Sequence, residues 1–416
     1  MKPSIRLLYL TYHENILGSG ILYTQVIRML ERMGETGGVE SITLLSFMSP
    51  QLLLRERKGF ARLKERLRGS GITLIALPML IPTTWSWVLQ LAMLLWTIPV
   101  LIVAVSKRCN IIHPRGYGAG ILALTVSKLL GVPYVFDPRG LYPEERVING
   151  VWSDRGITFR LYKYLETTLI RDASATIGVT TGLRDDFRVR NAKMACFIPN
   201  RADIEAWTKA AEVYRMSAQY DPKAAKCILL FTGELFSRWY DPAVLVRHYR
   251  AVKCHCPDVK LSMFTQLKAE KVYVSLTKLG VSKDEFSCRS GRPAEMPELI
   301  QGATLGLIIT NEQRSGWPAK FAESIWPVKF AEYLAAGIPV LMDENLLGLP
   351  PKLVKRHRLG LVVNPNRVED YRQVGEILSD WEAWSDRCIA YAKRRLDIKT
   401  TAKQHLRIYR QIIAKK

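Results

Sequence analysis

Lys329 and Glu332 lie three residues apart at the start of an expected short helix. Pro327 suits the first helical turn, where its missing N–H removes no hydrogen bond, and Gly337-Ile338-Pro339 ends the helix before a strand. A helix N-terminus offers free N–H groups and a positive dipole end to a phosphate, and Lys329 adds a formal charge. Glu332 shares a helix face with Lys329, and a carboxylate there can bind a ribose diol. This pattern predicts a nucleotide-diphosphate site, with an ordinary surface ion pair as the alternative.

A second candidate site is the loop that follows the first expected strand, Thr11–Gly20. Gly18 and Gly20 permit a substrate to approach the backbone closely. Tyr23 occupies the place where a dinucleotide-binding fingerprint requires a third glycine, so little favours an NAD enzyme. His13 is a candidate base or acceptor contact, although a lone histidine is more often a structural hydrogen-bonding residue.

The hydrophobic pattern predicts the scaffold that positions these residues. Short apolar runs alternate with helix-length stretches, which is typical of βαβ units and a parallel sheet. In the first half the expected strands are Ile5–Leu10, Ser41–Leu45, Ile72–Leu77, Asn110–His113, Tyr134–Phe136, Ala175–Val179 and Cys196–Ile198. In the second half they are Cys227–Phe231, Lys260–Phe264, Leu305–Ile309, Pro339–Met342 and Gly360–Val363. Ligands bind beyond the carboxyl ends of such strands, so the loops after them carry the chemistry.

The chain length of 416 residues fits two domains rather than one. The pattern predicts doubly wound α/β domains at residues 1–202 and 227–395, a linker at 203–226 and a basic helix within 396–416. This helix is free to pack on either domain.

A formal net charge of +22 favours an anionic partner: nucleic acid, an acidic membrane surface or a phosphate-bearing substrate. Leu91–Val105 is nearly continuous apolar sequence and is open to three interpretations: a buried helix, a helix dipping into a membrane interface, or a transmembrane span. Pro99 and the position between two strands of one sheet oppose the third. Arg55–Arg68 places a thin apolar stripe beneath a basic face, which suits a membrane-surface helix or a solvated surface helix.

The seven cysteines are an odd number without framework spacing, which predicts reduced thiols in a cytosolic protein. In Cys254-His255-Cys256 one residue separates the thiols where zinc motifs have two to four, so no metal site is expected. The first residues lead directly into a strand without an apolar signal core, so export is not expected.

Pro327–Val340, with the sequence PVKFAEYLAAGIPV, resembles the carboxy-terminal signature of family 4 glycosyltransferases, retaining enzymes with the two-domain GT-B fold. Val135–Arg146 is similar to the loop after a middle strand of the amino-terminal domain in a bacterial subgroup. Ile198-Pro199-Asn200 resembles the step into the interdomain linker, and Phe231–Leu235 the first strand and glycine turn of the donor domain. Ser290–Leu307 is similar to the stretch preceding the nucleotide-binding helix.

The resemblance spans roughly residues 5–365. It implies the GT-B fold class, two Rossmann-like doubly wound α/β domains with an interdomain cleft. Residues 1–202 would form the acceptor-side domain, and residues 227–395 the domain that binds the nucleotide-sugar donor.

Carried over residue by residue, the resemblance implies that Lys329 contacts the donor diphosphate and Glu332 the nucleotide ribose. Gly233 would let the backbone approach the phosphates. Arg238 stands where the family often has a cation for the diphosphate, a task that suits the charged fork of an arginine.

The sequence departs from the family pattern at two places. The family usually has two glutamates separated by seven residues, the first beside the transferred sugar, and here that position holds Ser324, with Glu323 one place off. Many relatives have histidine where Arg139 stands. Arg139 is expected to stabilise the leaving diphosphate or a phosphate of the acceptor. An Asp137–Arg139 ion pair that only orders the loop is the alternative.

The resemblance thus implies a retaining glycosyltransferase that uses a nucleotide-diphosphate sugar, with a lipid-linked saccharide or another surface-polysaccharide precursor as acceptor. Neither a side-chain nucleophile nor a metal or other cofactor is expected. We expect a cytoplasmic protein, peripheral at the inner face of the membrane, whose basic segments Arg55–Arg68 and Lys352–Arg358 meet an anionic lipid surface. A basic nucleic-acid-binding protein is a weaker alternative, because the charge is not gathered in a recognised module. A non-catalytic relative with the same fold is the other.

Overall fold

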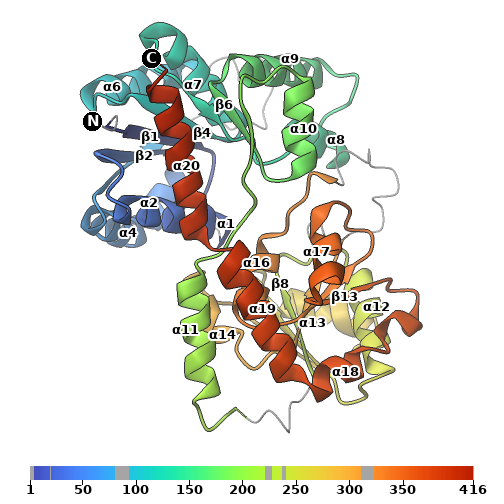
Figure 1. The fold of residues 1–416 in the computed structure, drawn as a ribbon. Helices are drawn as coiled ribbons and strands as arrows, with labels where there is room; N and C mark the ends of the chain where they lie inside the picture. The colour runs from blue at the N-terminus through green and yellow to red at the C-terminus, as the bar shows by residue number, and fades with distance from the viewer. Residues whose placement is uncertain are drawn as a thin grey trace. The chain divides into compact units, whose positions relative to one another are not determined.

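The computed structural model describes residues 4–18, 20–79, 93–220, 227–236, 240–310 and 323–415. The chain forms two compact units (Figure 1). Unit 1 consists of Met1–Pro199 together with Ile398–Lys416, and unit 2 is Asn200–Asp397. Both units contain parallel β-sheet and helices, so the predicted α/β class is confirmed.

The sheet of unit 1 is entirely parallel and has strand orders β3-β2-β1-β4 and β5-β6-β7. The strands are β1 Arg6–Tyr12, β2 Ser41–Met48, β3 Ile72–Pro78, β4 Ile111–Arg115, β5 Val135–Phe136, β6 Ala175–Gly178 and β7 Ala195–Phe197. Bridges between Ile112 and Tyr134 and between Arg115 and Asp137 join the two groups of strands. The order reverses at β1 and β4, the place where the loops after two neighbouring strands diverge and leave room for a ligand.

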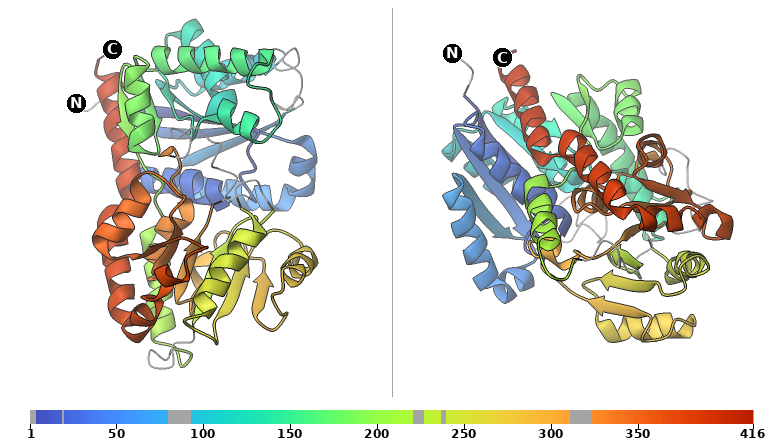
Figure 2. Two further views of the ribbon diagram at one scale, coloured as in Figure 1. Left: turned by 90° about the vertical axis from the view of Figure 1, so that its right-hand side faces the viewer. Right: turned by 60° about the horizontal axis from the view of Figure 1, so that its bottom comes forward.

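Helices lie on both faces of this sheet (Figure 2). They are α1 Gly20–Leu22, η1 Tyr23–Arg28, α2 Met29–Glu35, α3 Pro50–Arg55, α4 Arg57–Gly69, η2 Met93–Trp96, α6 Thr97–Ser106, α7 Gly116–Leu130, α8 Tyr142–Ile148, α9 Ile157–Asp172 and α10 Thr181–Val189. Strands β1, β2, β5 and β6 are buried on both faces and therefore appear in the sequence as largely apolar runs, whereas β3 and β7 are partly exposed.

The last helix, α20 (Ile398–Ile413), belongs to unit 1 although it follows unit 2 in the chain. It contacts α2, and its apolar face completes the core of unit 1 with Ala402, Leu406 and Tyr409 among the buried residues. The apolar periodicity of the helix, rather than its basic residues, thus selects its packing partner.

Unit 2 contains a parallel sheet with the order β10-β9-β8-β11-β12-β13. Its strands are β8 Ile228–Thr232, β9 Lys260–Phe264, β10 Phe286–Arg289, β11 Leu305–Ile308, β12 Val340–Asp343 and β13 Gly360–Val363. Its helices are α11 Ile204–Arg215, α12 Pro242–Lys253, α13 Ala269–Lys278, α14 Met296–Leu299, α16 Val328–Ala335, α17 Leu349–His357, η4 Val368–Tyr371, α18 Val374–Ser379 and α19 Trp381–Arg395. The strand order reverses between β8 and β11, which marks this pair as the ligand-binding position of the sheet.

All twelve apolar runs predicted as strands overlap a strand of the structure. The strand that the sequence analysis missed is β10, which pairs only with β9 at the edge of the sheet. Its four residues alternate between apolar and polar side chains, with Ser287 and Arg289 exposed. A short half-exposed edge strand lacks the continuous apolar run that marks a buried parallel strand.

The structure differs from the predicted boundaries in two places. The segment predicted as a linker, 203–226, begins with helix α11, whose Trp207 and Ala211 are buried. The helix predicted within 396–416 is not a separate part, because α20 contributes to the core of unit 1. Polar composition suggested a linker because α11 buries only one face.

The two segments considered for membrane contact have distinct structures. Part of Leu91–Val105 forms α6, in which Val100, Val103 and Ala104 are buried while Ile98 and Ile102 are exposed. In α4, Phe60 and Leu63 pack against the core of unit 1, so the thin apolar stripe faces the protein. Among the described residues, no helix has both the length and the apolar character needed to cross a bilayer.

Candidate functional site

The side chain of Lys329 lies in the first turn of α16, against the carboxyl end of β8. It is 7% exposed, and its Nζ donates to the carbonyl oxygen of Thr232. The ammonium group also lies 4.3 Å from the ring centre of Phe231 and 4.4 Å from that of Tyr240. A cation that is largely withdrawn from water acts more strongly on a nearby phosphate than a solvated surface lysine does.

Contacts of Tyr333 fix α16 at this position. Its hydroxyl accepts a hydrogen bond from the backbone N–H of Thr232 at 2.9 Å and lies 3.0 Å from the Thr232 hydroxyl. Its ring covers Gly306 of β11, where any Cβ atom would collide with the ring. The N-terminus of α16 is therefore held beside β8 and β11, where the strand order reverses. Glu332 is half-buried one turn beyond Lys329, as the helical spacing predicts.

Gly233 directly follows β8 and has φ of +137°, a region that glycine adopts without strain. A Cβ atom at this position would lie 3.3 Å from Lys329 Nζ and 3.4 Å from the Tyr240 ring. The structure thus brings together Gly233 and Lys329, two predicted residues from distant parts of the sequence. Arg238, the other predicted diphosphate contact, lies outside the described residues.

Glu323 and Ser324 lie shortly before α16, and the two differ in exposure. Ser324 is buried and Glu323 is exposed. The loop they belong to is fastened by Asn200, whose Nδ2 donates to the carbonyl oxygen of Trp326 at 2.7 Å. The Pro-Asn step recognised in the sequence therefore has a structural task in unit 2, since it holds the residue that precedes Pro327.

The Asp137–Arg139 pair lies in the loop after β5 in unit 1. Arg139 has φ of +66°, and its Nη1 donates to Asp137 Oδ2 at 3.3 Å. Asp137 is 2% exposed. Burial raises its pKa, but the charge of Arg139 and the neighbouring His113 ring outweigh burial, so the pKa lies below its ordinary value. Asp137 is therefore a carboxylate at neutral pH.

Arg115 and Glu14, which the sequence did not single out, form an ion pair beside this loop between a buried arginine and a half-buried glutamate. Arg115 ends β4, is 4% exposed and places its Nε 3.2 Å from Glu14 Oε1. Within the described part of the chain, Arg115 Nη1 and Asp137 Oδ1 have no hydrogen-bond partner. Burial and the nearby charge of Arg115 lower the pKa of Arg139. An arginine at the carboxyl end of a strand between Pro114 and Gly116 was the available sequence signal.

Glu145 is a further titratable group near the same loop. Its carboxylate lies next to Gly140. Burial and the neighbouring Glu144 raise its pKa to about 7, which makes it able to exchange a proton near neutral pH. Two adjacent glutamates after a proline give no sequence signal for such a shift.

The loop after β1 contains the remaining predicted residues. His13 is exposed and has φ of +61°, and its backbone N–H donates to the carbonyl oxygen of Phe47 at 3.0 Å. Gly18 closes a turn in which its N–H donates to Asn15 Oδ1 at 3.0 Å, and a Cβ atom would meet the Asn15 amide at 2.7 Å. Gly20 begins α1. Gly18 thus has a clear role in the shape of this loop.

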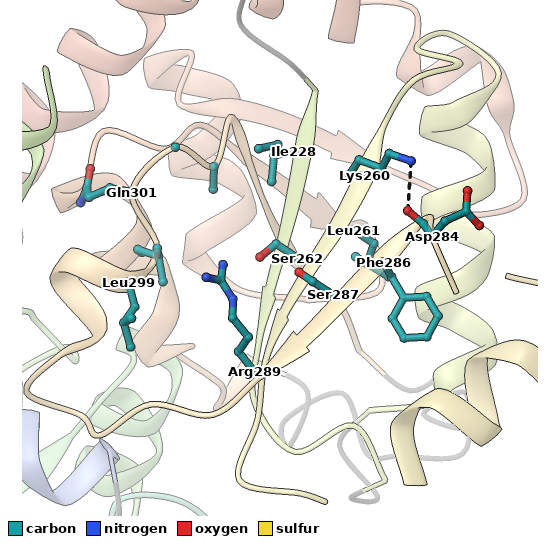
Figure 3. Close-up of a pocket in the computed structure, with 13 residues that line it drawn as sticks. Ile228, Lys260, Leu261, Ser262, Asp284, Phe286, Ser287, Arg289, Leu299 and Gln301 are labelled. Atoms are coloured by element: carbon teal, nitrogen blue, oxygen red, sulfur yellow. Dashed lines mark hydrogen bonds between the residues drawn. The ribbon is translucent and has the colours of Figure 1, made fainter. Parts of the chain in front are cut away.

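A pocket of about 360 Å³ lies elsewhere in unit 2 (Figure 3). The first residues of β8, β9 and β10 and the segment from Leu299 to Ala303 line it, and Arg289 projects between them. None of the predicted site residues lines this pocket. It lies mainly at the amino ends of the strands, whereas ligands of doubly wound sheets bind at the carboxyl ends.

The side chains of Cys254, His255 and Cys256 have different surroundings. Cys254 is exposed, and the His255 ring bonds to the carbonyl oxygen of Val368 at 2.9 Å. Among the residues that the structure describes, no group of three acidic, histidine or cysteine side chains is arranged to hold a metal ion.

Solved structures with the same architecture show which fold this chain has. HepE from Anabaena, crystallised with UDP and glucose, is 17% identical, with a TM-score of 0.64 over 97% of this chain and 98% of that one. Sucrose-phosphate synthase from Thermosynechococcus elongatus is 14% identical, with a TM-score of 0.65 over 99% of this chain and 100% of that one. A glycosyltransferase from Rickettsia africae is 12% identical, with a TM-score of 0.64 over 99% and 100%. These similarities establish the GT-B fold, as predicted.

A family model matches part of unit 1. Residues 29–201 match the model described as a glycosyl transferase 4-like domain. The predicted resemblance to family 4 glycosyltransferases is thereby confirmed. No curated protein sequence matches the chain significantly.

Proposed function

We propose that the protein transfers a sugar from a nucleotide-diphosphate sugar to an acceptor, with retention of anomeric configuration. The observation that carries this proposal is the buried ammonium of Lys329 at the N-terminus of α16, beside the Gly233 turn. A helix N-terminus, a desolvated cation and a glycine turn together suit a diphosphate. Glu332, on the same helix, is the proposed ribose contact.

The division of labour between the units forms part of the proposal. Unit 2 binds the donor, with UDP-sugars as the first candidates because HepE was crystallised with UDP-glucose. Unit 1 binds the acceptor near the loop of Asp137 and Arg139. The reaction then needs neither a side-chain nucleophile nor a metal, because positioned cations neutralise the charge that develops on the leaving diphosphate.

Ligand-induced thermal stabilisation tests the donor site. A ligand that binds only the native state at 100 times its Kd adds about 2.7 kcal/mol of stability. We expect UDP, or another nucleoside diphosphate of a panel, to raise the Tm of the wild-type protein by several degrees. The same nucleotide should leave the Tm of the Lys329→Met variant unchanged. Transfer assays with the stabilising nucleotide's sugars, followed by NMR of the product anomer, test the reaction itself. If no nucleotide raises the Tm while oligonucleotides bind tightly, the donor site is refuted and the nucleic-acid alternative gains support.

We propose further that the acceptor is lipid-linked, a surface-polysaccharide precursor, and that the enzyme works at the cytoplasmic face of an anionic membrane. The exposed face of α6 supports this proposal: Ile98, Ile102 and Val105 are 58%, 60% and 58% exposed at helical spacing. Lys107 and Arg108, both exposed, follow directly. An apolar face bordered by cations suits the boundary between acyl chains and anionic headgroups.

Replacing Ile98 and Ile102 together by glutamine is expected to weaken binding to liposomes containing anionic lipid at least tenfold. Each side chain contributes roughly 1–2 kcal/mol when its exposed apolar area leaves water. Co-sedimentation measures the effect, with Val189→Gln on α10 as the matched control, because Val189 is 82% exposed in the same unit. Equal binding of the double variant and the wild-type protein would exclude α6 as the contact surface.

A further inference from the structure

A buried tyrosine and a buried histidine connect the C-terminal helix to the Asp137–Arg139 loop. The Tyr409 hydroxyl, on α20, lies 2.5 Å from His113 Nδ1. His113 Nε2, on β4, lies 3.7 Å from Asp137 Oδ2, the same oxygen that accepts the hydrogen bond of Arg139. Tyr409 and His113 are both 0% exposed, and the Tyr9 ring stacks on the imidazole at 4.7 Å. All these residues belong to unit 1.

Unit 2 contains the same arrangement with a different end point. The Tyr371 hydroxyl lies 2.5 Å from His248 Nδ1, and His248 Nε2 lies 3.5 Å from Asp343 Oδ2. Asp343, however, binds backbone: it accepts from the N–H of Asn345 at 2.9 Å and from that of Thr310 at 3.4 Å. Tyr371, His248 and Asp343 therefore order the backbone around Asn345 and Thr310.

In unit 1 the carboxylate holds a cation instead. Asp137 Oδ2 accepts from Arg139, while Oδ1 has no partner within the described residues. Each unit thus contains a tyrosine, a histidine and an aspartate in this order. The aspartate binds backbone N–H groups in unit 2 and an arginine side chain in unit 1.

We infer that Tyr409 and His113 are positioning residues that hold the Asp137 carboxylate, and through it the Arg139 guanidinium, in place for catalysis. This inference rests on the proposed function, in which Arg139 stabilises phosphate charge. It assigns the C-terminal helix a role in the chemistry of the acceptor-side loop, although the tyrosine and the histidine are 296 residues apart in the sequence.

The groups beside the two ring nitrogens, the Tyr409 hydroxyl at Nδ1 and the Asp137 carboxylate near Nε2, determine which nitrogen of His113 carries the proton. Burial lowers the pKa of His113, so the imidazole is neutral. If Nδ1 carried the proton, the lone pair of Nε2 would face a carboxylate. With the Tyr409 hydroxyl donating to Nδ1, the proton resides on Nε2 and points towards Asp137. Removal of the hydroxyl removes the group that selects this tautomer.

Tyr409→Phe tests the inference, with Tyr371→Phe as the matched control in unit 2. We expect Tyr409→Phe to lower kcat about tenfold with the donor KM nearly unchanged, a size typical of groups that orient a catalytic side chain. Tyr371→Phe loses an equivalent buried hydroxyl and should lower Tm comparably without lowering kcat. His113→Gln, which keeps an amide N–H near the position of Nε2, should retain more activity than His113→Asn.

Nitrogen NMR of histidine-labelled protein supplies a readout that does not depend on turnover. The wild-type spectrum should show His113 protonated at Nε2, and Tyr409→Phe should shift this signal and the Nε–H signal of Arg139. Unchanged kcat and unchanged spectra in Tyr409→Phe, with only a lower Tm, would show that Tyr409 and His113 have a purely structural role. Full activity of Arg139→Ala would also overturn the inference. If the wild-type protein transfers no sugar, the proposed function fails, while the spectra still decide whether Tyr409 orders His113 and Arg139.

Discussion

Lys329→Met is expected to reduce kcat/KM for sugar transfer by about 10²–10³-fold, the range found when one preorganised electrostatic contact to a transition state is lost. The methionine retains an unbranched apolar stem against Phe231 and Tyr240 but has no charge to offer the diphosphate. Lys329→Ala should have an effect at least as large, because it also empties the space between the two rings. Initial rates at varied donor concentration measure both variants.

Lys253→Ala is the matched control for Lys329. Lys253 ends α12 in the same unit, pairs with Glu285 and is not among the predicted site residues. Its removal should change stability slightly and leave kcat/KM unchanged. If Lys329→Met folds normally and keeps wild-type turnover, the donor site has been assigned to the wrong helix.

Arg139→Ala should lower kcat by about 10²-fold or more, with a smaller change in donor KM, because a cation aimed at developing charge acts mainly in the transition state. Arg139 has φ of +66°, which arginine, alanine and lysine all meet with a Cβ atom. Arg139→Lys accompanies the alanine variant, since it retains the charge and loses the planar fork. We expect it to recover part of the rate.

The stability of these variants separates chemistry from folding. Arg139→Ala leaves Asp137 buried without its cation, so Tm should fall as well as kcat. Asp137→Asn removes that uncompensated charge and provides the comparison. If Arg139→Ala and Asp137→Asn lose stability equally but the former loses much more turnover, Arg139 acts on the substrate and Asp137 positions it. If Arg139→Ala retains full turnover, the pair is a structural ion pair that orders the loop.

The residues of the proposed donor site that the structure describes were predicted from the sequence. Lys329 and Glu332 lie on one short helix, so their spacing defines their geometry wherever the helix packs. Gly233 was implied by the resemblance, and its φ of +137° directly after β8 is likewise a local property of the chain. The twelve strands could also be predicted from local sequence, because a strand of a covered parallel sheet tends to be a run of apolar residues.

The acceptor-side site depends on tertiary structure. His113 and Arg115 lie on β4, Asp137 follows β5 and Tyr409 lies on the last helix, and no spacing in the sequence relates Tyr409 or Asp137 to β4. The same holds for Asn200, whose hydrogen bond to Trp326 crosses 126 residues. Long-range contacts of this kind depend on how complete elements pack.

The sequence by itself thus determined the class of fold, the strands and the residues that serve one local element, because periodicity and turn chemistry act within a few residues. Only the tertiary structure decided that the C-terminal helix completes unit 1 and that a buried tyrosine and histidine reach the Asp137 loop. It also decided that α4 packs its apolar stripe inward while α6 leaves one apolar face exposed. These outcomes follow from which faces are covered, a property of the packed chain rather than of any segment.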